Sequence, residues 1–145
     1  MSIRPFDPNT WITIYKSTRC VYLNPERTIV AKSSYPSGSR YESAGLAQNA
    51  VEWSVWSDTN YDMLAPCLAF EDGILYQQYI HGGYPYCPVS EAEQVEIDKI
   101  VEYGGLWHDD IWVNWHAMEV NPYQFVREDT TGKLWMVDYG GCRGQ

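Results

Sequence analysis

The chain has 145 residues, of which 45% are hydrophobic and 15% aromatic, and its formal net charge is −9. This length suits one domain of ordinary size, and the apolar content supports a buried core rather than a disordered chain. No stretch approaches the roughly 18 uncharged apolar residues of a membrane span. The first thirty residues also lack the pattern of a signal peptide. We therefore expect a cytoplasmic protein that makes no membrane contact.

The negative charge is distributed unevenly along the chain. Residues 1–57 carry six basic and four acidic side chains, whereas the remaining residues carry four basic and fifteen acidic ones. Because an acidic protein and nucleic-acid phosphates repel each other, we expect no direct binding to nucleic acid. The acidic part favours solubility, and its alternatives are a surface for a basic partner or a mimic of nucleic acid.

The four cysteines are scattered through the sequence and form no CxxC pair. This spacing argues against a structural zinc site and against a thioredoxin-like redox site. We expect free thiols that are buried or half-buried.

The first half of the chain predicts a three-stranded antiparallel meander, then a helix, then a hairpin. Short β-rich runs occupy residues 11–15, 20–23 and 28–32. Residues 40–58 predict a helix, because apolar side chains recur there at spacings of three and four. These apolar residues are Ala44, Ala47, Val51 and Val55. Two further β-rich runs, 64–70 and 74–80, flank the turn Glu71-Asp72-Gly73 and predict a hairpin.

The second half of the chain follows a connector, residues 81–88, that is rich in Gly, Pro and aromatic residues. Ser90 and Glu93 have the spacing of a capping box, which predicts a helix that ends near Glu102. Residues 106–118 predict a second helix, 119–124 a loop, and 125–127 and 134–137 two short strands. Because strands come first and helices later, the order indicates the α+β class with two subregions.

Five polar residues offer the kinds of group that phosphoryl transfer from a nucleotide requires. That chemistry needs a Lys on the phosphates, an acid that fixes this Lys, metal-binding groups and a group that positions the nucleophile. Lys32 ends the third predicted strand, and Glu52 lies on the helix that follows. Asp138 ends the last predicted strand before a Gly-rich turn, and Glu119 precedes Gln124 by five positions. The oxygen ligands of Asp138 and Gln124 are of the hard type that Mg²⁺ prefers.

These residues lie in segments that resemble the motifs of the protein-kinase-like superfamily. Val30-Ala31-Lys32 resembles the V-A-I-K strand, and Asp138-Tyr139-Gly140 resembles the D-F-G motif. The segment Glu119-x-Asn-Pro-x-Gln124 resembles the catalytic loop D-L-x-P-x-N. The chain is most similar to the small kinase-like proteins of bacteriophages, and the resemblance spans about residues 11–141.

The resemblance implies a role for each of the matching residues. Lys32 binds phosphates of ATP and pairs with Glu52, and Gln77, Tyr79 and Ile80 border the adenine. Asp138 and Gln124 hold Mg²⁺, and Glu119 orients the acceptor hydroxyl. Residues 15–18 replace the expected Gly-rich loop without a glycine, so Lys16 or Arg19 substitutes in part for its phosphate contacts.

The resemblance also implies the architecture, which is a truncated protein-kinase-like fold in a single domain over residues 1–145. Residues 1–80 form an antiparallel N-terminal sheet with one helix, and residues 81–88 form a hinge-like connector. Residues 89–145 form a reduced, helical C-terminal subregion with a β-hairpin.

Two functions are consistent with these motifs. The first is an ATP- and Mg²⁺-dependent phosphotransferase with altered motifs. The alternative is a catalytically inactive, pseudokinase-like protein that binds a host or regulatory protein through an acidic, aromatic surface. In either case the resemblance to bacteriophage proteins implies the host cytoplasm as the location.

Overall fold

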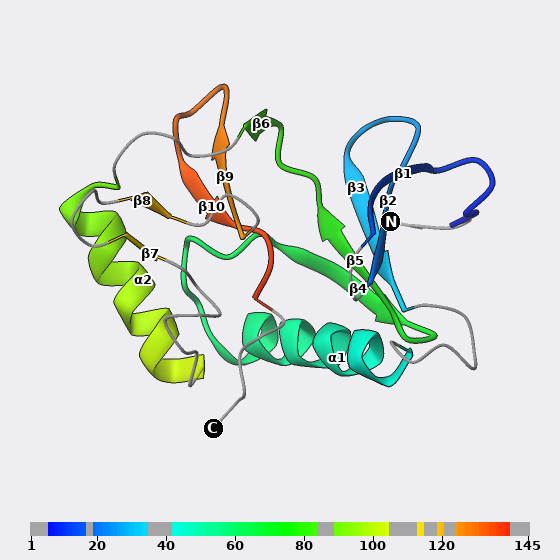
Figure 1. Cartoon of the computed structure of the whole chain (residues 1–145), viewed down its shortest axis with the longest axis horizontal. Coiled ribbons are helices and arrows are strands. Elements are labelled where there is room, and N and C mark those ends of the chain that lie inside the picture. Colours follow the sequence, from blue (N-terminus) through cyan, green and yellow to red (C-terminus); the bar gives the residue numbers. More distant parts are fainter. Residues whose placement is uncertain are drawn as a thin grey trace.

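The computed structural model describes residues 6–16, 19–34, 42–83, 89–104, 113–114, 119–120 and 124–139. These residues form a five-stranded antiparallel sheet, two helices, a three-stranded sheet and a two-stranded ribbon, so the fold is of the α+β class (Figure 1). Neither of the two helices in the described part of the chain is long and apolar enough to cross a membrane.

The large sheet has the strand order β1-β2-β3-β5-β4, with antiparallel neighbours throughout. Its strands are β1 (Ile12–Lys16), β2 (Cys20–Leu23), β3 (Ile29–Ser33), β4 (Cys67–Glu71) and β5 (Ile74–Gln78). The predicted meander and the predicted hairpin are therefore confirmed. At the tip of the hairpin, Asp72 and Gly73 both have a positive φ, of 54° and 78°, as a tight two-residue turn requires.

Helix α1 (Glu42–Asp58) packs against β3, β4 and β5, but its buried face differs from the predicted apolar stripe. Val55 is buried as predicted, whereas Ala47 is exposed to solvent. Asn49 and Glu52 are fully buried instead. The reason is that this face of the helix meets charged side chains from the sheet, so polar partners occupy its centre.

The second part of the molecule contains α2 (Glu91–Gly104) and a sheet in the order β10-β9-β6. The strands are β6 (Gly82–Gly83), β9 (Phe125–Glu128) and β10 (Leu134–Met136). The predicted capping box is confirmed, since the Glu93 amide donates to Ser90 Oγ at 3.1 Å and the Ser90 amide donates to Glu93 Oε1 at 2.8 Å. The predicted connector, residues 81–88, contains the short strand β6 near its start. Residues 84–88 lie outside the described part of the chain.

The predicted helix over residues 106–118 is wrong at Val113–Asn114. These two residues form β7, which pairs with β8 (Glu119–Val120), a segment predicted as a loop. The other residues of both segments lie outside the described part of the chain. A short apolar, Trp-rich run does not distinguish a helix from a strand by periodicity, and β-branched Val favours the strand.

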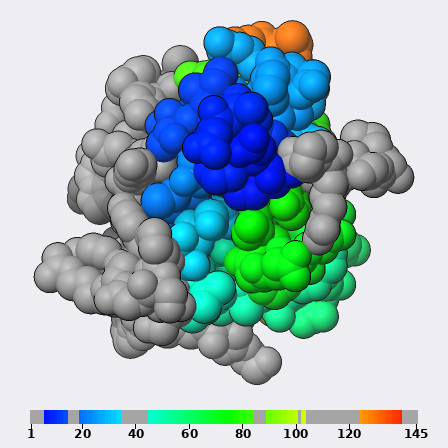
Figure 2. Space-filling model, turned by 90° about the vertical axis from the view of Figure 1, so that its right-hand side faces the viewer, coloured from blue at the N-terminus to red at the C-terminus, as the bar shows by residue number. Residues whose placement is uncertain are grey.

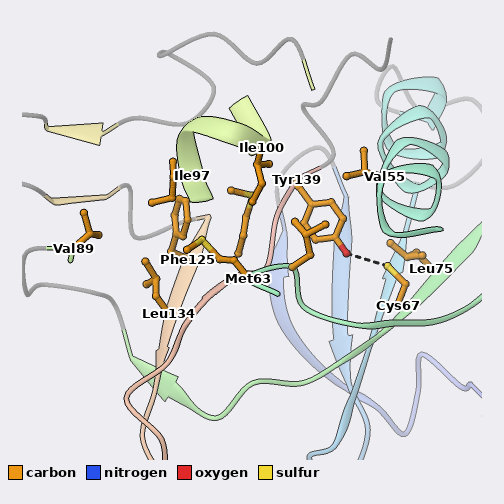
Figure 3. Close-up of a cluster of buried hydrophobic side chains, with 12 residues drawn as sticks. Val55, Met63, Cys67, Leu75, Val89, Ile97, Ile100, Phe125, Leu134 and Tyr139 are labelled. Atoms are coloured by element: carbon orange, nitrogen blue, oxygen red, sulfur yellow. Dashed lines mark hydrogen bonds between the residues drawn. The ribbon is translucent and has the colours of Figure 1, made fainter. Parts of the chain in front are cut away.

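One hydrophobic core joins both sheets and both helices, as Figure 3 shows. Val55 of α1 and Leu75 of β5 reach it from one side, and Ile97 and Ile100 of α2 from the other. A smaller cluster on the opposite face of the large sheet centres on Trp11. It explains why the blue N-terminal segment lies against the sheet, next to the green β4–β5 region in Figure 2.

Candidate functional site

Four charged side chains meet where the large sheet, α1 and the segment after β10 come together. Arg19 immediately precedes β2, Lys32 lies on β3, and Glu52 lies on α1. Asp138 follows β10, and Figure 1 shows this red segment descending toward α1. We call these four residues the charge network; its two positive and two negative charges balance.

The predicted pair of Lys32 and Glu52 is present in the network. Lys32 Nζ donates to Glu52 Oε1 at 2.7 Å and to Oε2 at 3.1 Å, and it donates to the carbonyl oxygen of Val137 at 2.5 Å. An ammonium group has three hydrogens, so these three acceptors use all of its donors. Glu52 is 0% and Lys32 5% exposed, so both lie in the protein interior rather than at the solvated surface usual for these residue types.

Arg19 is the residue that connects this pair to Asp138. Its Nη1 donates to Glu52 Oε1 and to Asn49 Oδ1, each at 2.9 Å. Its Nη2 donates to Asp138 Oδ1 at 2.9 Å and to Glu52 Oε2 at 3.4 Å. The sequence predicts only a supporting phosphate contact for Arg19 and does not indicate this central position. The strand register contains a signal, because Cys20 pairs with Ser33 and this places Arg19 at the same sheet end as Lys32.

The environment keeps the Glu52 carboxylate and the Arg19 guanidinium charged. Burial disfavours the Glu52 carboxylate, but the Arg19 and Lys32 cations outweigh this effect and hold the pKa of Glu52 below its usual range. Burial likewise disfavours the Arg19 cation, and Glu52 with Asp138 outweighs it and raises the pKa of Arg19. The network is therefore ionic at neutral pH, and its stability depends on the balance of its charges.

Asn49 fixes the network to the sheet and is a second residue that sequence reasoning missed. Its Nδ2 donates to the carbonyl oxygens of Lys32 at 2.9 Å and of Gly73 at 2.8 Å. Its Oδ1 accepts from Arg19. Asn49 lies three positions before Glu52, so both side chains share one face of α1. That spacing is the only local signal of its role.

Gln77, predicted beside the adenine, lies in the interior next to Tyr139. Its Nε2 is 3.3 Å from Tyr139 Oη, which donates to the carbonyl oxygen of Ala65 at 2.8 Å. Cys67 Sγ lies 3.2 Å from the same phenol oxygen, and Figure 3 shows this contact. Burial raises the pKa of the Cys67 thiol to about 11. Through its contacts with Cys67 of β4 and Gln77 of β5, Tyr139 anchors the segment that contains Asp138.

The other predicted adenine neighbours follow β5 directly. Tyr79 is half-buried and Ile80 is buried. The Tyr79 amide donates to the carbonyl oxygen of Thr28 at 2.9 Å, and the Tyr79 ring contacts His81 edge-on with centroids 4.7 Å apart. These contacts place Tyr79 between the β2–β3 turn region and the start of the connector.

The predicted loop residues are described in part. The carbonyl oxygen of Gln124 accepts from the amides of Val137 at 2.8 Å and Asp138 at 3.4 Å, so the structure brings Gln124 and Asp138 together. Glu119 lies on β8, but its side chain, like that of Lys16, is outside the described part.

The described residues contain no cluster of metal-binding side chains of the kind that holds an ion by itself. No group of three or more His, Cys, Asp or Glu side chains is placed to hold a metal ion in the described ranges. Both carboxylates of the charge network, Glu52 and Asp138, accept hydrogen bonds from Arg19. A guanidinium thus stands at the carboxylate of Asp138, one of the two residues that the resemblance assigns to a metal.

The chain was compared with known protein families and with curated proteins, and neither comparison gives a match.

Proposed function

We propose that the chain is a kinase-like protein that binds a nucleoside triphosphate beside the charge network. The observation that supports this proposal most directly is the buried pair of Lys32 and Glu52, joined through Arg19 to Asp138. A strand Lys held by a helix Glu, with an Asp after a later strand, is the arrangement by which such proteins face nucleotide phosphates.

Each residue has a proposed role in this site. Lys32 supplies positive charge for the phosphates, and Glu52 holds Lys32 in position. Gln77, Tyr79 and Ile80 border the adenine. Glu119 orients the acceptor hydroxyl. The phosphotransferase form of the proposal further requires Mg²⁺ at Asp138 and Gln124, and this requires Asp138 to leave Arg19.

A second candidate function is supported by the hydrogen bonds that the charge network makes within the protein. All three hydrogens of Lys32 Nζ and the terminal nitrogens of Arg19 have acceptors within the protein. A fully satisfied buried network rigidifies a fold without any ligand. This favours a pseudokinase-like scaffold that binds a basic host or regulatory protein, for which the exposed acids of α2 offer complementary charge. Those acids are Glu91, Asp98 and Glu102.

Calorimetric titration with ATP, in Mg²⁺ and in EDTA, tests nucleotide binding. We expect the wild type to bind, Lys32→Met to lose at least tenfold in affinity, and Lys99→Met, which removes an exposed Lys on α2, to bind like the wild type. Circular dichroism checks that each variant is folded. A wild type that binds no ATP under either condition would contradict the proposal.

A phosphate-release assay on the same samples separates the two functions. Turnover of ATP that is lost in Lys32→Met supports the phosphotransferase. Binding without turnover supports the pseudokinase-like protein. In that case the partner is sought with a basic peptide array, and Glu91→Gln/Asp98→Asn/Glu102→Gln is the variant expected to lose the interaction.

A further inference from the structure

The geometry points to Arg19 as a built-in cation that occupies Asp138 in place of a divalent metal. This inference deepens the proposed nucleotide site and rests on the assignment of Asp138 to it. It states how that site is neutralised, and it predicts that the wild-type protein does not bind Mg²⁺ or Mn²⁺ through Asp138. Of the two proposed functions it therefore favours the pseudokinase-like protein.

The guanidinium of Arg19 lies between the carboxylates of Glu52 and Asp138. Nη2 of Arg19 donates both to Asp138 Oδ1 at 2.9 Å and to Glu52 Oε2 at 3.4 Å. The two acids therefore lie close together and share one cationic nitrogen. Two neighbouring carboxylates would otherwise repel each other, and a positive charge between them is needed for both to stay ionised.

A divalent metal and the Arg19 guanidinium exclude one another at Asp138. Mg²⁺ demands oxygen ligands at about 2.1 Å in octahedral geometry and is a doubly charged ion. At Asp138 Oδ1 such an ion would lie in direct repulsion with the Arg19 charge. A metal can bind at Asp138 Oδ1 only after Arg19 and Asp138 have separated.

Arg19 is held in place by burial and by its hydrogen bonds. It is 5% exposed, and Asn49 and Glu52 hold its other donors. Withdrawal of the guanidinium would leave the buried Glu52 with Lys32 alone and would leave Asn49 Oδ1 without this donor. Asp138, by contrast, has 44% of its side chain exposed, so a metal could reach it from solvent if Arg19 were absent.

Binding of Mn²⁺ in the absence of nucleotide tests this inference, with free Mn²⁺ measured by electron paramagnetic resonance. We expect wild type and Asp138→Asn to bind Mn²⁺ equally weakly. We expect Arg19→Gln to gain a site at least tenfold tighter than any in the wild type, and Arg19→Gln/Asp138→Asn to lose it. If Arg19 were only a structural residue, its removal would not create a metal site.

Arg127→Gln is the matched control, because Arg127 is paired with Glu93 at 2.6 Å, apart from the charge network. We expect this variant to gain no Mn²⁺ site. Wild-type binding that is at least tenfold tighter than that of Asp138→Asn would overturn the inference, and this comparison holds even if Arg19→Gln does not fold. A folded Arg19→Gln without a new site would overturn it as well.

Because nucleotide is absent, this result is separate from the test of the proposed function. If the wild type binds no ATP, nucleotide binding fails while the Mn²⁺ comparison still decides the role of Arg19.

Discussion

Arg19 and Asp138 are joined by a hydrogen bond of 2.9 Å between Nη2 and Oδ1, although 119 positions separate them in the chain. The bond ties the start of β2 to the segment after β10. Glu52 and Asn49 extend the same connection to α1. The charge network is thus a structural link between the two parts of the molecule as well as the candidate site.

Loss of the central carboxylate is expected to destabilise the protein strongly. Glu52→Gln leaves the buried Arg19 and Lys32 without their shared counter-charge, and breaking such a buried pair costs about 3–5 kcal/mol. Urea unfolding followed by circular dichroism measures the loss. Glu26→Gln, at an exposed turn position, is the control and is expected to change stability by less than about 0.5 kcal/mol. A loss of under about 1 kcal/mol for Glu52→Gln would contradict the balance of charges described above.

Acid is expected to remove the contribution of Glu52 in a defined direction. The Arg19 and Lys32 cations overcome the effect of burial and lower the pKa of Glu52 in the folded state, so its stabilisation is complete above the unfolded value of about 4.3. It is lost as the pH falls below that value and through the folded pKa. The free energy of unfolding is therefore expected to fall as the pH drops below about 4.3.

The variant Glu52→Gln isolates this contribution, since it cannot titrate and its curve should be shallower than that of the wild type. Glu93 contributes in the same direction, because its pKa is also lowered: burial opposes the shift, while hydrogen bonds from Arg127 and the Ser90 amide outweigh it. Parallel curves for wild type and Glu52→Gln would show that Glu52 does not titrate as described.

Removal of the Tyr139 hydroxyl tests the anchor of the Asp138 segment. Tyr139→Phe leaves the buried Ala65 carbonyl and Gln77 amide without this partner, which is expected to cost about 1–3 kcal/mol. Tyr61→Phe is the control, because the ring of this half-buried tyrosine packs against Tyr103 and is kept by the change. Chemical denaturation of both variants provides the comparison, and equal losses would argue against a special role for the Tyr139 hydroxyl.

The thiol of Cys67 is expected to resist alkylation in the native protein. It is buried, and its pKa is raised to about 11, so both access and the reactive thiolate are suppressed near pH 8. Iodoacetamide labelling followed by peptide mass mapping measures modification at this site. Labelling of Cys67 should require denaturant, and labelling at the same rate in native buffer would contradict the described packing.

Local patterns in the sequence determined much of this fold. The β-branched run at β3, the Asp72-Gly73 turn and the capping box of Ser90 and Glu93 are each specified by neighbouring residues, so their signals survive without tertiary context. The buried cysteines were predicted from composition, and Cys20 and Cys67 are buried and free. The segment at 113–114 shows the limit, because a short apolar run fits a helix or a strand equally well.

The sequence likewise predicts only part of the candidate site. The sequence by itself placed Lys32 at a strand end, Glu52 on the next helix and Asp138 after a late strand, and the structure brings these three into one network. Only the tertiary structure decided that Arg19 lies between Glu52 and Asp138 and that Asn49 holds it. The physical reason is that a charged or amide side chain has the same local signature on a surface as in a buried pair. The packing of sheet and helix determines the partners of such a side chain, which lie up to 119 positions away in the chain.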